Sequence, residues 1–176
     1  MLEAMKAMLA IALGGLLMFP FSSKADLLKA GDTAPDFTAA ASDGSTVRLK
    51  DFVSKGPVVL YFYPKDDTPG CTKEACGIRD SFEEFKGLKA TVFGVSFDSV
   101  ESHKKFIAKY KLPFTLLADT DKKIAVTYGA AGPHSLVASR VTFIIGRDGR
   151  IARVFPKVSP AAHAAELREA VAALLK

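Results

Sequence analysis

Apolar residues gather in short, nearly continuous runs separated by turn residues, a pattern typical of strands buried inside a sheet. The clearest runs are Pro57–Tyr63 (PVVLYFY) and Ala90–Phe97 (ATVFGVSF), which are rich in β-branched and aromatic residues. Ser139–Ile145 and Ile151–Phe155 are two further predicted strands, and Asp148-Gly149 between them predicts a hairpin.

Helical spacing of apolar residues alternates with these strands. Thr68-Pro69 predicts a helix start, because threonine is a good N-cap and proline is favoured at the first helical position. The predicted helices run from Thr68-Pro69 to Lys86-Gly87, from Ser99 to Tyr110, from Asp119 or Thr120 toward Tyr128, and from Ser159-Pro160 onward with Leu167, Val171, Leu174 and Leu175 on its inner face.

The order of these elements predicts the fold class. Turn residues fill Gly31–Asp36, and Asp43-Gly44 between two β-compatible segments predicts an N-terminal β-hairpin. A β-α-β-α unit, a short helix, two strands and a last helix follow. We therefore expect an α/β protein with a mixed β-sheet flanked by helices, and a thioredoxin-like fold is the natural candidate.

The first 25 of the 176 residues differ from the rest. Lys6 precedes the apolar run Met8–Phe21, and the small residues Ser23 and Ala25 predict a secretory signal cleaved after Ala25. The run is shorter than the roughly 20 residues that a membrane span needs. We expect a leader over 1–25, one domain over 26–176, and export to the periplasm. The alternative is an uncleaved leader that anchors the protein to the inner membrane.

Charge and ligand-type residues exclude several function classes. The net charge is +5, but positive and negative residues alternate, so we expect no nucleic-acid partner. Two cysteines are too few for a disulfide scaffold or a four-thiolate zinc site. His103, His134 and His163 lack ligand spacing and are predicted to be surface residues, and Asp66-Asp67 is predicted to be solvated. We expect neither a metal nor another cofactor.

Cys71 is the strongest candidate for chemistry. If Thr68 is the cap, Cys71 is the third residue of the first helical turn, where unpaired N–H groups and the helix dipole favour a reactive thiolate. The alternative is an inert buried cysteine. A strand-turn-helix junction with Thr68, Pro69 and Gly70 favours the functional interpretation.

Cys76 follows five residues later in the same predicted helix. Helix geometry separates the Cα atoms of residues i and i+5 by about 8.6 Å. A disulfide needs less than about 7 Å. Either the two cysteines are unrelated, or catalysis unwinds this helix. Their spacing also differs from the two intervening residues of a thioredoxin-type exchange site.

The segment Tyr63–Cys76 (YPKDDTPGCTKEAC) resembles the active-site segment of the peroxiredoxins, in particular the peroxiredoxin Q or bacterioferritin comigratory protein subgroup. It contains a Pro-x-x-x-Thr-x-x-Cys signature. Further likeness covers Gly31 through Asp43-Gly44, Gly94–Asp98, Leu116–Asp121 and Arg140–Gly149.

The resemblance implies a role for five residues. Cys71 would be the peroxidatic cysteine and Cys76 the resolving cysteine. Pro64 would shield the thiolate from water, Thr68 would hydrogen-bond the thiolate and the peroxide, and Arg140 would reach across from a neighbouring strand. The alternatives without a catalytic role are a helix cap for Thr68 and a surface strand residue for Arg140.

The activity implied is that of a thiol-dependent peroxidase. It would reduce hydrogen peroxide and organic hydroperoxides through a Cys71 sulfenic acid and a Cys71–Cys76 disulfide. A thioredoxin-like dithiol protein would recycle the disulfide, no cofactor would be needed, and we expect a monomer. Two features depart from the subgroup: the leader, and the segment Gly129–Ser139, which replaces a longer, Trp-containing loop.

Two other functions stay open at this point. The first is a thiol–disulfide oxidoreductase that acts on proteins, against which the four-residue gap between the cysteines and the Thr68/Arg140 pair argue. The second is a non-catalytic thioredoxin-like domain held by a structural disulfide. A permanent Cys71–Cys76 bridge would disrupt the predicted helix.

Overall fold

The computed structural model describes residues 26–176, so the predicted leader lies outside the described residues. No helix within this part of the chain is long and apolar enough to cross a membrane. The elements are β1 (Thr38–Ala41), β2 (Thr46–Arg48), α1 (Lys50–Val53), β3 (Val58–Phe62), α2 (Pro69–Asp80), α3 (Phe82–Gly87), β4 (Thr91–Ser96), α4 (Val100–Tyr110), β5 (Thr115–Ala118), α5 (Lys123–Thr127), β6 (Val141–Ile145), β7 (Ile151–Phe155) and α6 (His163–Ala173).

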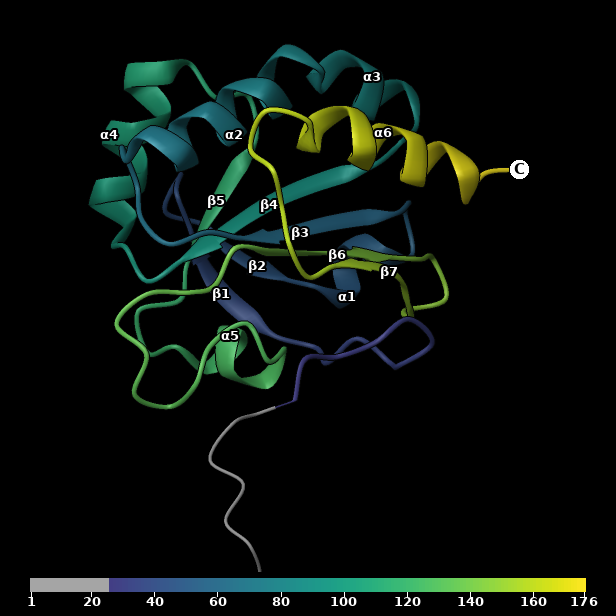
Figure 1. Ribbon diagram of the computed structural model, residues 1–176, viewed down its shortest axis with the longest axis horizontal. Coiled ribbons are helices and arrows are strands. Elements are labelled where there is room, and N and C mark those ends of the chain that lie inside the picture. Colours follow the sequence, from purple (N-terminus) through teal and green to yellow (C-terminus); the bar gives the residue numbers. More distant parts are fainter. Residues whose placement is uncertain (1–25) are drawn as a thin grey trace, which may run out of the picture.

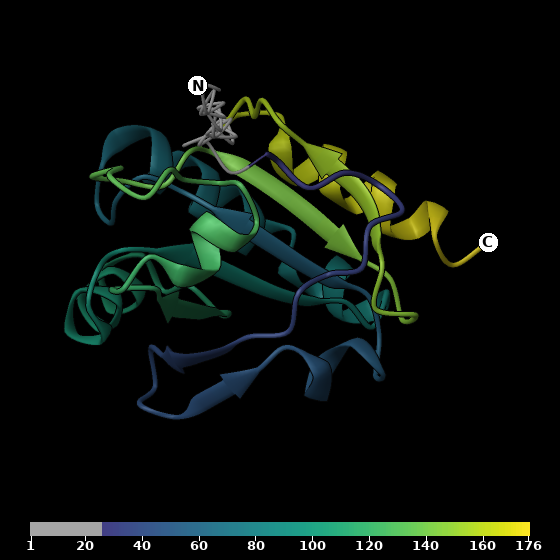
Figure 2. The same cartoon turned by 90° about the horizontal axis from the view of Figure 1, so that it is seen from below.

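One seven-stranded sheet organises the fold, with strand order β2-β1-β5-β4-β3-β6-β7. β3, β4 and β5 are parallel, whereas the strands outside them pair antiparallel. Helices α2, α3, α4 and α6 lie on one face, and α5 lies on the other (Figures 1 and 2). This confirms the predicted mixed sheet with helices on both faces. The N-terminal hairpin is also confirmed, with Gly44 at φ +89° in its turn.

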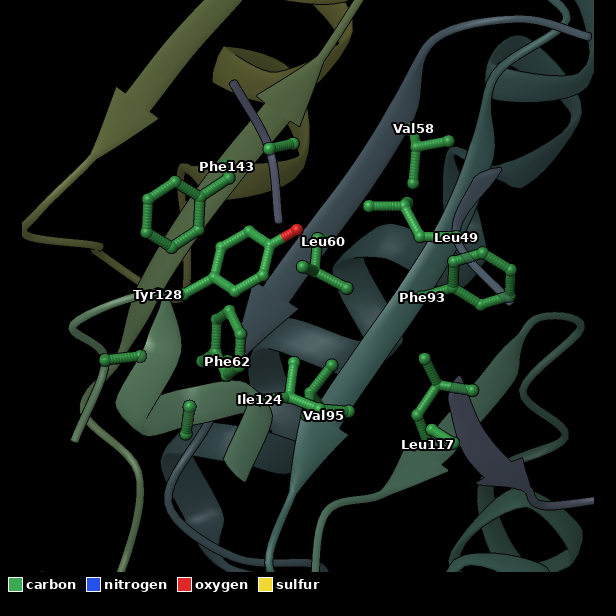
Figure 3. Packing of buried hydrophobic residues seen from close by; sticks show 14 of the residues in the cluster. Leu49, Val58, Leu60, Phe62, Phe93, Val95, Leu117, Ile124, Tyr128 and Phe143 are labelled. Carbon is green, nitrogen blue, oxygen red and sulfur yellow. The ribbon is translucent and has the colours of Figure 1, made fainter. Parts of the chain in front are cut away.

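The central strand β3 is buried on both faces, as its apolar run predicts. Val58, Leu60 and Phe62 point into the core under α1 and α5, part of which Figure 3 shows. Val59 and Tyr61 point into the opposite core. That second core is completed from the four helices above the sheet, chiefly by Ile78, Phe85, Phe106 and Leu167.

Two elements differ from the sequence prediction between residues 68 and 118. The single helix expected from Thr68-Pro69 to Lys86-Gly87 is two helices, because the backbone turns at Ser81 (φ −100°, ψ 8°). Strand β5 was missed, since Thr115–Ala118 is too short for a clear period-two pattern. It is placed in the sheet by parallel pairing with β4, which no local pattern encodes.

The last helix begins later than predicted. Ser159 starts a turn in which its carbonyl accepts the N–H groups of Ala162 and His163, and α6 proper begins at His163. Leu167 is fully buried as expected. The prediction for Leu174 and Leu175 is wrong: they are 42% and 50% exposed, because the helix ends at Ala173, before they can reach the sheet.

Candidate active site

Cys71 lies where the sequence predicts, at the third position of α2. Thr68 is extended (φ −92°, ψ 150°) and precedes Pro69 at the helix start. The N–H of Thr72 closes the first turn on the carbonyl of Thr68 at 2.8 Å. Cys71 therefore lies at the positive end of the helix dipole, and its side chain is only 2% exposed, so little water competes there.

Arg140 reaches this sulfur from another element. Its Nη2 atom donates to Cys71 Sγ at 3.2 Å. The sheet makes this contact possible, because Arg140 immediately precedes β6, whose first residue, Val141, pairs with Phe62 at the end of β3. The chain runs from that end of β3 into α2. A Cβ atom at Gly70 would lie only 3.2 Å from Arg140 Nη2, so the absence of a side chain there leaves room for the guanidinium.

Glu74 is a site residue that sequence reasoning missed. Its Oε2 accepts a hydrogen bond from Arg140 Nη1, and its side chain is fully buried. Burial raises the pKa of Glu74 to about 7, against the lowering effect of Arg140. Burial also works to lower the pKa of Arg140, but the hydrogen bond to Cys71 and the charge of Glu74 outweigh it and raise that pKa. The i, i+3 spacing to Cys71 on one helix face could have revealed Glu74.

His163 lies beneath Glu74, and the prediction that it is a surface residue is wrong. The side chain is fully buried, with Nε2 2.8 Å from Thr142 Oγ1 and 3.8 Å from Glu74 Oε1. Its ring packs edge-on against Phe155. Burial lowers the pKa of His163 to about 4, against the raising effect of Glu166. No local pattern could have revealed it, since its burial depends on how α6 packs over β6 and β7.

The other implied site residues lie around this centre. Thr68 is half-buried, and its hydroxyl donates to the carbonyl of Lys65 at 3.0 Å. Pro64 is half-buried in the loop between β3 and α2. Cys76 is half-buried on the intact helix α2, and both cysteines are free. A structural Cys71–Cys76 bridge therefore finds no support.

The loop before α2 is fixed by a buried carboxylate. Asp66 is 8% exposed, and it accepts hydrogen bonds from Tyr63 Oη at 2.6 Å and Ser102 Oγ at 2.7 Å. The fully buried His103 places Nδ1 2.9 Å from the same carboxylate. The predictions of a solvated Asp66 and a surface His103 are therefore wrong, because helix α4 packs onto this loop. Asp67 is exposed as predicted.

A separate cavity lies away from Cys71. It has a volume of about 420 Å³ and is lined by β1, α5 and neighbouring loops, including Asp36 and Asp119. Asp119 is already engaged, since its carboxylate accepts the N–H groups of Ile124 and Ala125 and so starts α5. Among the described residues, no group of three or more His, Cys, Asp or Glu side chains could hold a metal ion.

A buried thiol at a helix N-terminus, contacted by an arginine that immediately precedes strand β6 of a thioredoxin-like sheet, is the arrangement of a thiol-based redox site. The chain belongs to the AhpC/TSA family, which it matches over residues 30–154.

Similar proteins of known class show which subgroup of this family the chain resembles. The chain is 47% identical over 126 residues to peroxiredoxin Q of Sedum lineare, covering 71% of this chain and 67% of that protein. It is 43% identical over 145 residues to peroxiredoxin Bcp of Bacillus subtilis, covering 79% and 92%. It is also similar to the crystal structure of peroxidoxin BcpB from Mycobacterium tuberculosis, with a TM-score of 0.78, 36% identity and coverage of 84% and 98%.

These similarities confirm the resemblance to the peroxiredoxin Q and Bcp subgroup and the thioredoxin-like fold. The chain is accordingly a peroxiredoxin, a thiol-dependent peroxidase, rather than a protein disulfide oxidoreductase.

Proposed function

We propose that Cys71 is the peroxidatic cysteine of this peroxidase, that Cys76 is its resolving cysteine, and that the enzyme reduces hydrogen peroxide and organic hydroperoxides in antioxidant defence. The strongest support is the 3.2 Å contact between Arg140 Nη2 and the buried Cys71 sulfur. A guanidinium and a helix N-terminus both favour the thiolate, which is the nucleophilic form.

In the peroxide step, the Cys71 thiolate attacks one peroxide oxygen. The sulfur–oxygen bond forms as the O–O bond breaks, and the second oxygen takes up a proton and leaves as water or an alcohol. Negative charge develops on that leaving oxygen. Arg140 and the N–H groups of the first turn of α2 supply hydrogen-bond donors for it. We assign Thr68 a donor role toward the peroxide, for which its hydroxyl turns away from the carbonyl of Lys65. We assign Pro64 the role of limiting water at the thiolate.

In the resolving step, the first turns of α2 unwind. The Cα atoms of residues i and i+5 in an intact helix are about 8.6 Å apart, beyond the reach of a disulfide. Once the helix opens, the Cys76 thiol condenses with the Cys71 sulfenic acid, the S–S bond forms and water leaves. A thioredoxin-like dithiol protein then reduces the disulfide by thiol–disulfide exchange and is itself oxidised.

The cellular location and the monomeric state of the enzyme are also part of this proposal. The pattern of residues 1–25 supports cleavage after Ala25, export to the periplasm and a mature domain over 26–176. We also propose that this domain acts as a monomer. Retention at the inner membrane by an uncleaved leader is the alternative.

Rapid-quench mixing of the reduced full chain with hydrogen peroxide tests the assignment of the cysteines. Free thiols are alkylated at each time point and counted by mass spectrometry. Fast, stoichiometric loss of both thiols is expected in the parent chain, whereas Cys71→Ser should keep its one remaining thiol, that of Cys76. Cys76→Ser should accumulate one sulfenic acid, trapped by a 1,3-diketone reagent. Slow thiol loss at the rate of an ordinary free cysteine would overturn the proposal for this substrate.

A further inference from the structure

Helix α2 carries buried polar atoms that have found no partner. In the part of the chain that the structure describes, five buried side-chain polar atoms lack a hydrogen-bond partner. Two of them, Thr72 Oγ1 and Glu74 Oε1, belong to residues of α2 between Cys71 and Cys76. A third, His163 Nδ1, belongs to the residue packed beneath Glu74. Each costs free energy, because it has lost water and gained no replacement.

The carboxylate of Glu74 is also poorly neutralised. Arg140 donates to Glu74 through Nη1 and to Cys71 through Nη2, so one cation serves two groups that are both anionic when ionised. The free oxygen, Oε1, faces His163 Nε2 across 3.8 Å, and that nitrogen is already engaged with Thr142. An unpaired buried carboxylate oxygen makes the ionised form costly in this position.

Three charged or titratable groups outside α2 lie near the Glu74 carboxyl: Arg140 just before β6, His163 on α6 and Tyr61 on β3. On α2 itself, Cys71 shares the Arg140 guanidinium with Glu74. Burial raises the pKa of Glu74 to about 7. His163 stays neutral near pH 7, because burial lowers its pKa to about 4 against the effect of Glu166 at 3.6 Å. The imidazole therefore does not compensate the carboxylate.

We propose that Glu74 promotes the resolving step: its buried, partly unpaired carboxylate destabilises the closed form of α2 and so favours the unwinding that brings Cys76 to Cys71. Glu74 is a positioning residue, since it acts through the helix and not on the peroxide. The inference rests on the proposed function, because it assumes that α2 must open. Opening moves no electrons. It frees Glu74 to ionise in water, and the condensation of Cys76 with the sulfenic acid then proceeds with loss of water.

The sign of the pH dependence follows from linkage. The closed helix raises the pKa of Glu74 above its usual value of 4.5, so the closed form binds more protons than the open form. Closure is therefore favoured below about pH 4.5, and this advantage is lost as the pH rises through about 7. His163 has the opposite sign, since opening relieves a lowered pKa and is favoured in acid.

Hydrogen exchange of the α2 amides measures this opening without any turnover. The full chain is studied as Cys71→Ser, which removes the titration of the thiol, and as Cys71→Ser with Glu74→Gln. The opening constant of Cys71→Ser is divided by that of the double variant, and this ratio cancels the contribution of His163, which both proteins share. We expect this ratio to rise at least tenfold between pH 5 and pH 8, with a ceiling of about 70-fold for pKa values of 4.5 and about 7. As a matched control, Glu83→Gln neutralises an exposed carboxylate on α3. The opening constants of Cys71→Ser with and without Glu83→Gln should have a ratio near one at every pH.

A ratio that does not change with pH would overturn the proposal. If Glu74→Gln does not fold, Glu74→Leu provides the same comparison with a side chain of similar size that cannot ionise. Failure of the proposed function would be seen elsewhere, as the absence of a Cys71–Cys76 disulfide when the parent chain meets peroxide. The two failures are therefore distinguishable.

Discussion

The guanidinium of Arg140 donates to the sulfur of Cys71 across 3.2 Å, although 69 positions separate the two residues along the chain. The contact joins the residue before β6 to the first turn of α2, and it is possible because β6 pairs with β3, the strand that leads into α2. It gives the thiol a positive partner that does not depend on the helix alone. Its removal should therefore affect the reaction with peroxide more than the stability of the fold.

Arg140→Ala should slow the oxidation of Cys71 by about ten- to a thousand-fold, which is the range expected when one transition-state donor is lost. The rate constant for thiol loss after mixing with hydrogen peroxide measures this. Arg48→Ala, on the edge strand β2, is the control and should react at the parent rate. An unchanged rate in Arg140→Ala would reduce Arg140 to a structural role.

Gly70→Ala should disturb the same contact indirectly. The new Cβ would lie 3.2 Å from Arg140 Nη2, which is tighter than ordinary packing and pushes the guanidinium away from Cys71. Because Arg140 can give way by a few tenths of an ångström, we expect a loss smaller than that of Arg140→Ala, about threefold to tenfold in thiol oxidation. The double variant Gly70→Ala, Arg140→Ala should react like Arg140→Ala alone; additive losses would show that Gly70 acts in another way.

Gly77→Ala should separate the resolving step from the peroxide step. Gly77 lies inside α2 next to Cys76, and a Cβ there would meet Ala164 at an ordinary 3.7 Å. Alanine stabilises a helix interior by about 1 kcal/mol relative to glycine. If α2 must unwind before the disulfide forms, that step should slow about fivefold. Thiol oxidation at Cys71 should keep its rate.

The measurement is the delay between sulfenic acid formation and disulfide formation after a single addition of peroxide. Gly87→Ala, at the exposed end of α3 with open space around its Cβ, is the matched control. Equal resolving rates in Gly77→Ala and the parent chain would argue against unwinding of this part of α2.

Much of this arrangement could be predicted from local sequence. The apolar run of β3, the Thr68-Pro69 helix start and the Asp-Gly hairpins follow from short-range rules, so the fold and the position of Cys71 were correctly expected. The partnership of Arg140 with Cys71 came only through the family resemblance. Strand order in the sheet, which creates that contact, depends on pairing between segments far apart in the chain.

The buried polar residues could not be predicted in this way. His103 and His163 lie on helices whose polar residues are mostly solvated, and only the packing of α4 and α6 places these two rings inside. Asp66 and Asp67 are adjacent and chemically identical, yet one is buried and the other exposed. Backbone direction decides this difference, since Asp67 takes a positive φ of 55° and turns its side chain outward toward Lys109.

The difference in burial between Asp66 and Asp67 predicts a difference in their contributions to the stability of the fold. Asp66→Ala leaves the buried Tyr63 and His103 and the half-buried Ser102 without their acceptor, which should cost roughly 3–5 kcal/mol of unfolding free energy. Asp67→Ala removes only an exposed, solvent-screened pair with Lys109 and should cost much less. Urea denaturation at pH 7 compares the two variants with the parent chain. Equal losses would contradict the assignment of Asp66 as the anchor of the active-site loop.

The contribution of Asp66 should also depend on pH. Burial acts to raise the pKa of Asp66, but the hydrogen bonds from His103 and Tyr63 outweigh it and lower the pKa below its usual 3.8. A depressed carboxyl pKa adds stability that is fully present above pH 3.8 and is lost as the pH falls through the lower, folded-state value. The stability difference between the parent chain and Asp66→Ala should thus be constant from pH 5 to 7 and shrink below pH 4. A difference that grows on acidification would show that the anchor works in the protonated form.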